Sequence, residues 1–274
     1  MKNLYLVILL VMSSQIFGQS GDFIETNGVK LYYEIHGKGE PLVLLHGNTG
    51  SHDTWAQWLD ELSEEYKVIT VDLRGHGQST HPVNEVTHKD YALDIFGLLD
   101  AISVDKFSAM GHSTGGMTLI HMATMQSDRL KSLILIGATP YFSTETRKNM
   151  KMLGYEQVSE DNPQWIEYMR GVHPGGEEQI KSLLDNYVRW ADIYDDMNFT
   201  PPSLSAIGCP TLIIHGDQDS FFPIEIPTYL YDNIPDSYLW IIPNFGHSIP
   251  EHNTVLGNMF ISSIKEFLAG KWDK

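Results

Sequence analysis

The chain has 274 residues, 42% of them hydrophobic, and its 18 Lys and Arg against 35 Asp and Glu give a formal net charge of −17. That length supports one large domain with a full core, and so negative a chain repels nucleic acid phosphates and anionic lipid surfaces. Nucleic acid is therefore not an expected partner.

The N-terminus has the pattern of a secretory signal peptide. Lys2 is followed by a nine-residue apolar run from Leu4 to Met12 and then by a polar segment. The run is too short to span a bilayer, and the order of basic, apolar and polar segments is typical of an export signal. We therefore assign residues 1–20 to a signal peptide and expect a periplasmic or secreted protein with no stable membrane anchor after cleavage.

The exported protein should begin between Gln19 and Asp22, because the polar end of the signal places the cut between Gly18 and Gly21. N-terminal sequencing or the intact mass of exported material checks this expectation. Recovery of a chain that still begins with Met1 would contradict it and would turn the segment into a membrane-associated one.

Cys209 is the single cysteine, so no internal disulfide can stabilise the exported chain. It stands before Pro210 at the start of a predicted strand, where a small buried side chain is expected rather than a reactive thiol. The fold must therefore be held together by packing.

The first predicted elements form a β-hairpin, and an α/β alternation follows. Residues 22–26 and 29–36 are predicted strands around Asn27-Gly28, a dipeptide that favours a tight hairpin turn. Six later runs are predominantly apolar, as in strands buried on both faces: residues 42–45, 68–71, 107–110, 133–136, 211–214 and 238–242. Helical patterns alternate with them: residues 54–66, 87–102, 117–126, 224–233 and 254–268. This order predicts an α/β fold with a mostly parallel, doubly wound sheet.

The alternation breaks between Thr139 and Ile207. No buried strand is predicted there, and Pro163, Pro174-Gly175-Gly176 and Pro201-Pro202 separate helical segments. We predict an inserted helical cap at residues 139–208, which divides the α/β core into residues 21–138 and 209–274. The aromatic cap residues either line a pocket or form the cap's own core: Tyr141, Phe142, Trp165, Tyr168, Trp190 and Phe199.

Ser113 stands in a Gly-X-Ser-X-Gly motif, Gly111 to Gly115, between a predicted strand and a predicted helix. A strand that turns into a helix within two residues needs glycines on either side, since side chains there would collide. The serine is then exposed at the tip of the turn and at a helix N-terminus, where negative charge is stabilised. This is the position of a nucleophile.

A serine nucleophile needs a base, and the base needs a carboxylate that fixes its tautomer. Such groups are expected in loops at the carboxyl ends of parallel strands. Asp217 and Asp219 follow one predicted strand, and His247 follows the next. Either aspartate is available for the carboxylate role, but Asp217 directly follows the glycine that ends the strand, where Asp commonly stabilises its own turn.

These motifs, together with the loop His46-Gly47-Asn48 and the segment Asp72 to Ser79, resemble those of the α/β-hydrolase fold family. The resemblance covers nearly the whole chain after the signal peptide apart from the cap. It implies Ser113 as the nucleophile, His247 as the general base and Asp219 as its orienting carboxylate, in the chain order known for that fold. The implied oxyanion hole consists of the backbone N–H groups of Asn48 and Thr114.

Other residues near the motifs are given supporting roles. Asp72 and Arg74 are expected to brace a loop. The resemblance implies that His46, His76 and His112 are structural or pocket-lining residues, and His112, next to the serine at a sharp turn, is expected to point elsewhere. No spacing typical of metal ligands, phosphate loops or dinucleotide sites occurs, so the expected chemistry uses no cofactor and no metal.

The expected function is that of an exported serine hydrolase that cleaves a small, neutral to apolar carboxylic ester through an acyl-enzyme. Its partner is thus a small-molecule substrate. The same triad also suits lactone, amide or carbon–carbon bond hydrolysis and a perhydrolase or haloperoxidase-like activity, which fold and triad do not separate. A non-enzymatic protein that binds a small ligand is the alternative from another class, although it would not need all three triad residues.

Overall fold

The computed structural model describes residues 21–80 and 85–272 of the chain. The predicted signal peptide at residues 1–20 lies outside this part. Among the helices of the described residues, none combines the length and the apolar character that crossing a membrane requires.

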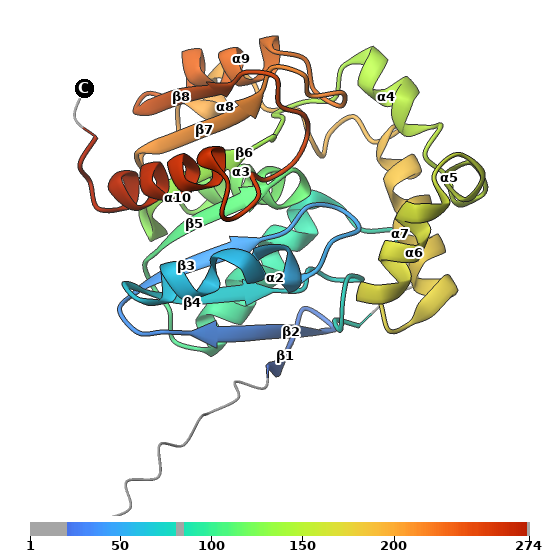
Figure 1. Cartoon of the computed structure of the whole chain (residues 1–274), viewed down its shortest axis with the longest axis horizontal. Helices are drawn as coiled ribbons and strands as arrows, with labels where there is room; N and C mark the ends of the chain where they lie inside the picture. The colour runs from blue at the N-terminus through green and yellow to red at the C-terminus, as the bar shows by residue number, and fades with distance from the viewer. Residues whose placement is uncertain (1–20, 81–84, 273–274) are drawn as a thin grey trace, which may run out of the picture.

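An eight-stranded sheet occupies the centre of the fold (Figure 1). Its strands, in the order β1-β2-β4-β3-β5-β6-β7-β8, are β1 (Asp22–Thr26), β2 (Val29–His36), β4 (Tyr66–Val71), β3 (Glu40–Leu45), β5 (Phe107–His112), β6 (Leu130–Ile136), β7 (Thr211–Gly216) and β8 (Ser237–Ile242). β2 pairs antiparallel with β1 and β4, while all other pairs are parallel. The predicted mostly parallel α/β sheet is confirmed.

The sheet is buried on both faces, as the apolar runs predicted. In β3 the side chains of Val43 and Leu45 enter one core, and those of Leu42 and Leu44 enter the other, because successive residues of a strand face opposite sides. Helices cover both faces (Figure 1). The first core is shared by α2 (His88–Ala101), α3 (Thr114–Met125) and α9 (Glu225–Asn233), and the second by η1 (His52–Trp58), α1 (Leu59–Ser63) and α10 (Val255–Leu268).

The helix predicted at residues 54–66 is shorter and divided. A 3-10 helix, η1, comes first, and the single turn of α1 ends at Ser63. The helix cannot continue to residue 66, because strand β4 begins at Tyr66. Cys209 is 3% exposed, and burial raises the pKa of its thiol to about 11, so its prediction as an unreactive core residue is confirmed.

Helices fill the segment between β6 and β7: α4 (Thr144–Met150), α5 (Tyr155–Asp161), α6 (Pro163–Val172), α7 (Gly176–Trp190) and α8 (Pro201–Leu204). We call α4 to α7, residues 144–190, the cap, which lies to one side of the sheet in Figure 1. A small apolar cluster, which includes Val158, Ile166 and Ile180, gives it a core of its own. The α8 helix instead contacts α3 and α9 of the main body. The boundaries at residues 139 and 208 stay a prediction.

Candidate active site

Ser113 lies at a sharp turn between β5 and α3. Its backbone has φ 51° and ψ −117°, a strained conformation for a residue with a side chain. A Cβ at Gly111 would lie 2.5 Å from the carbonyl carbon of Gly115, and one at Gly115 would lie 2.3 Å from the carbonyl oxygen of Leu45. Both flanking positions therefore require glycine. The Ser113 side chain makes no capping hydrogen bond to α3, so its hydroxyl is not committed to the helix.

Backbone amides suited to an oxyanion lie next to this serine. Thr114 is the first residue of α3, and the first amides of a helix have no partner within it. A Cβ at Gly47 would lie 3.3 Å from that of Ser113, so the loop after β3 passes directly beside the serine. Asn48 lines the same cavity as Ser113, and its side-chain Oδ1 lies 3.1 Å from His76 Nε2. The oxyanion role predicted for the two amides is compatible with this arrangement.

His247 is oriented by a buried carboxylate. Its Nδ1 lies 2.6 Å from Oδ2 of Asp219, whose Oδ1 accepts hydrogen bonds from the amides of Phe221 and Phe222 at 2.8 and 2.9 Å. Burial alone would raise the pKa of Asp219, but the hydrogen bonds from His247 and the two amides outweigh it and lower that pKa. The carboxylate is thus ionised and holds a proton on Nδ1, which leaves Nε2 available as a base.

Ser113 and His247 line one cavity. No hydrogen bond joins them among the described residues, and bonds of this kind often form only when a substrate is bound. The structure thus brings all five predicted site residues to one place. Their catalytic roles stay predictions that the substitutions below test.

Asp217 supports the loop that carries the histidine. Its Oδ1 accepts a hydrogen bond of 3.2 Å from the amide of Phe245, two residues before His247, so the prediction that it stabilises its own turn was wrong. The reason is the parallel pairing of β7 and β8, which places the loops that follow the two strands side by side.

His112 lines the cavity, so the pocket-lining role that the resemblance implied is confirmed, whereas the expectation that it points elsewhere was wrong. Its ring centroid lies 5.0 Å from that of His247, and burial lowers the pKa of His112 to about 3, which keeps the ring neutral. Space for the ring comes from Gly47, where a Cβ would lie 2.9 Å from His112 Nδ1.

The cavity measures about 580 Å³ and is lined by residues of four loops and of the cap: Gly47, Asn48, Thr49, Gly50, Thr54, His112, Ser113, Asn162, Trp165, Tyr168, Tyr187, Phe221, His247, Ser248 and Ile249. Within the described part of the chain, none of these is Lys, Arg, Asp or Glu. Two of the cap aromatics have the predicted pocket-lining use, and two others are buried in the core of the main body rather than in the cap's own cluster. Trp165 and Tyr168 line the cavity, together with Tyr187, which sequence reasoning missed, whereas Phe142 and Trp190 are buried in the core.

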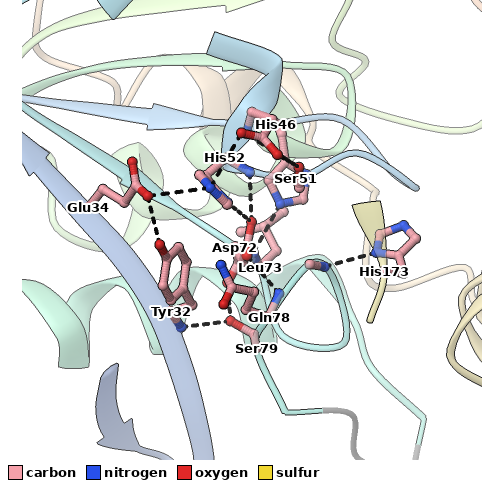
Figure 2. A network of polar contacts seen from close by, with 12 residues as sticks. Tyr32, Glu34, His46, Ser51, His52, Asp72, Leu73, Gln78, Ser79 and His173 are labelled. Atoms are coloured by element: carbon pink, nitrogen blue, oxygen red, sulfur yellow. Dashed lines mark hydrogen bonds and ion pairs between the residues drawn. The ribbon is translucent and has the colours of Figure 1, made fainter. Parts of the chain in front are cut away.

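Figure 2 shows the polar network that supports the loops of the site. Asp72 accepts hydrogen bonds from the backbone amide of His52 at 2.6 Å and from the amide of Gln78 at 2.7 Å. His46 accepts one from the amide of Leu73 through Nε2, at 3.0 Å. The loops after β3 and β4 are thereby tied together. Arg74 pairs with Asp94 of α2, so both Asp72 and Arg74 brace loops as predicted.

Acid should destabilise the folded chain in the range in which free histidine titrates. Burial lowers the pKa of five histidines: His46, His88, His112, His173 and His215. The unfolded chain, with imidazoles near a pKa of about 6.5, then binds more protons than the folded one, so stability falls as the pH drops. His52, whose pKa is raised, acts in the opposite direction.

For His173 the pKa of about 4 corresponds to a loss of about 3 kcal/mol between pH 6.5 and pH 4. Urea unfolding at pH 7.5 and pH 4.5 measures the change. His173→Gln, which cannot titrate, should show a shallower loss over the same range. An unfolding free energy that stays constant or rises on acidification would contradict this assignment of neutral buried histidines.

Comparison with known proteins finds a matching fold family and similar enzymes. The family described as the alpha/beta hydrolase fold matches residues 40–165. A 2-hydroxy-6-oxo-6-(2'-aminophenyl)hexa-2,4-dienoic acid hydrolase of Metapseudomonas resinovorans is 25% identical over 260 residues, which cover 88% of this chain and 89% of that enzyme. A putative non-heme chloroperoxidase of Synechocystis is 29% identical over 255 residues, which cover 81% of this chain and 89% of that protein.

Solved structures also include a similar enzyme. A thermophilic esterase from Thermogutta terrifontis superposes with a TM-score of 0.71 at 26% identity, and the match covers 92% of this chain and 98% of the esterase.

Proposed function

This chain is a hydrolase of the α/β-hydrolase fold, and we propose that it is an exported serine hydrolase that cleaves small, uncharged carboxylic esters. Ser113 Oγ attacks the ester carbonyl while His247 Nε2 takes its proton, and Asp219 stabilises the resulting imidazolium. The amides of Asn48 and Thr114 stabilise the tetrahedral oxyanion.

The covalent intermediate then forms and decays in two balanced steps. The carbon–oxygen bond to the alcohol breaks as His247 returns the proton to the leaving oxygen, which leaves the acyl group on Ser113. A water molecule, deprotonated by His247, attacks the acyl carbonyl. The acid is released and the proton returns to the serine.

The lining of the cavity carries the proposal for an uncharged substrate. Its side chains are aromatic, aliphatic, amide, hydroxyl and imidazole groups, and none of the lining residues in the described chain is Lys or Arg. An anionic substrate would lose its hydration there without gaining a cationic partner, which costs several kcal/mol. The chain's net charge of −17 also repels anions at longer range.

Carbon–carbon bond hydrolysis is the second candidate, since the relative from Metapseudomonas resinovorans, matched over most of both chains, is named for a dienoic acid. A substrate of that class carries a carboxylate, for which a basic side chain is the usual partner. Among the described residues that line the cavity of this chain there is no Lys or Arg. This observation favours the ester.

The test compares two substrates of nearly equal size, p-nitrophenyl butyrate and p-nitrophenyl hemisuccinate, in which a carboxylate replaces the terminal methyl group. We expect kcat/KM to be at least about 100-fold higher for the butyrate, since the unpaired carboxylate opposes binding by about 3 kcal/mol or more. Equal or preferred turnover of the hemisuccinate would contradict an uncharged substrate. Turnover of a 2-hydroxy-6-oxo-dienoate with neither ester hydrolysed would instead favour the carbon–carbon hydrolase.

A further inference from the structure

The cap is joined to the loop of the proposed oxyanion hole by a buried histidine. His173 follows α6 and is 1% exposed. Its Nε2 lies 3.0 Å from the carbonyl oxygen of Thr49, and its Nδ1 accepts a hydrogen bond of 2.9 Å from the amide of Gly77, a contact drawn in Figure 2. Because a carbonyl only accepts and an amide N–H only donates, the ring must be neutral with its proton on Nε2.

The residue held by His173 is strained. The amide of Gly50 donates to the carbonyl of Gly47 at 3.1 Å and closes a four-residue turn, in which Thr49 has φ 62°. A positive φ at the third position is typical of type II turns and suits glycine, whereas a β-branched residue there is under strain. Such strain persists only where the surroundings fix the conformation.

The contacts that fix Thr49 come mostly from the cap. Its hydroxyl donates to the carbonyl of Asn48 at 2.6 Å, which is local to the turn. The indole N–H of Trp165 donates to that hydroxyl at 3.2 Å, and His173 donates to the Thr49 carbonyl. Two of the three hydrogen bonds therefore depend on cap residues. Without them the turn is expected to relax. Because the Gly50 amide holds the Gly47 carbonyl, which shares its peptide plane with the Asn48 N–H, that plane would tilt as well.

The second position of this turn is Asn48, whose amide is one of the two donors in the proposed oxyanion hole. We propose that His173 is a positioning residue, which ties the cap to the turn at residues 47–50 and holds the Asn48 N–H in the direction of the developing negative charge. The inference rests on the proposed function. It implies that the cap does more than cover the pocket, because it completes the geometry of the oxyanion hole.

Gln179 of α7 provides a matched control. Its Nε2 donates to the carbonyls of Gly75 and Gly77, both at 2.9 Å, and the residue is 3% exposed. It thus joins the same cap to the loop that His173 also contacts, through a buried polar side chain of similar size. It makes no hydrogen bond to Thr49.

The experiment measures kcat, KM and the unfolding midpoint of His173→Ala, His173→Gln and Gln179→Ala with an uncharged p-nitrophenyl ester. Complete loss of an oxyanion donor costs about 10²- to 10³-fold in kcat, and a misplaced donor should cost less. We expect His173→Ala to lower kcat about 10- to 100-fold with KM within about 3-fold. The amide of His173→Gln can accept from Gly77 and donate to Thr49, so it should recover kcat to within about 5-fold of wild type. Gln179→Ala should lower the unfolding midpoint but leave kcat within about 3-fold.

Unchanged kcat in a folded His173→Ala protein would overturn the inference. An equal loss of kcat in Gln179→Ala would also overturn it, since that result would show only that the cap must dock. If His173→Ala does not fold, Trp165→Phe decides. It removes the indole N–H that reaches Thr49, together with part of a ring that lines the cavity, so kcat at saturating substrate is the readout. It should fall at least about 3-fold, and unchanged kcat would overturn the inference. Wild-type protein without Ser113-dependent turnover would refute the proposed function itself, which distinguishes the two failures.

Discussion

Ser113→Ala is expected to lower kcat on p-nitrophenyl esters by at least about 10⁴-fold, because it removes the atom that forms the acyl-enzyme. The change deletes a single oxygen whose side chain makes no capping hydrogen bond, so the fold should be retained. Circular dichroism and the unfolding midpoint verify this, and kcat is measured with the folded variant.

Ser248→Ala is the matched control, because Ser248 lines the same cavity and has no assigned role. We expect it to retain kcat within about tenfold. If folded Ser113→Ala kept more than about one-hundredth of wild-type kcat, Ser113 would not be the nucleophile. Loss of turnover in Ser248→Ala alone would transfer the role to that residue.

Asp219→Asn is expected to lower kcat by about 10³- to 10⁴-fold, or about 4 to 5.5 kcal/mol of barrier. The amide has the size of the acid but carries donor hydrogens, so it can hold His247 in the tautomer that lacks a free base at Nε2. The bond of 2.6 Å between Asp219 and His247 is the contact that the substitution alters. The kcat of the purified variant, relative to wild type, measures the effect.

Asp217→Asn is the paired control. Its side-chain oxygen can still accept the hydrogen bond from Phe245, so the loss should stay below about tenfold. Equal and small losses for both variants would mean that another group orients His247. A large loss confined to Asp217→Asn would reverse the choice between the two aspartates.

Much of the sheet could be predicted because its sequence signals are local. The hairpin bounds agree with the structure at β1 and β2, since Asn27 and Gly28 both adopt the positive φ that their turn requires. The short apolar runs each became a strand, although the edge strand β8 is only half-buried. The ends were less exact: β6 begins at Leu130, three residues before the apolar run, because Leu130 already pairs with Phe107 of β5, and the register resumes at Leu133 after an irregularity.

The residues of the site also differ in whether neighbouring or distant parts of the sequence determine their positions. The elbow at Ser113 follows from glycines within two residues of it, and the structure gives the steric reason for each. Tyr187 was missed as a lining residue because the loop residues with which it lines the cavity, such as Asn48 and Ser113, lie far from it in the sequence. His173 and Thr49, which are in contact, lie 124 residues apart in the sequence, and no local pattern indicates this contact.

The central claim, that Ser113 is an activated nucleophile, is tested most directly by labelling the protein with a fluorophosphonate probe and locating the adduct by peptide mass spectrometry. We expect about one equivalent of adduct on Ser113 in the wild-type protein and none in Ser113→Ala. An adduct on Ser248 or another residue, or no rapid labelling of the folded wild-type chain, would contradict it, and the latter would favour a protein that only binds a ligand.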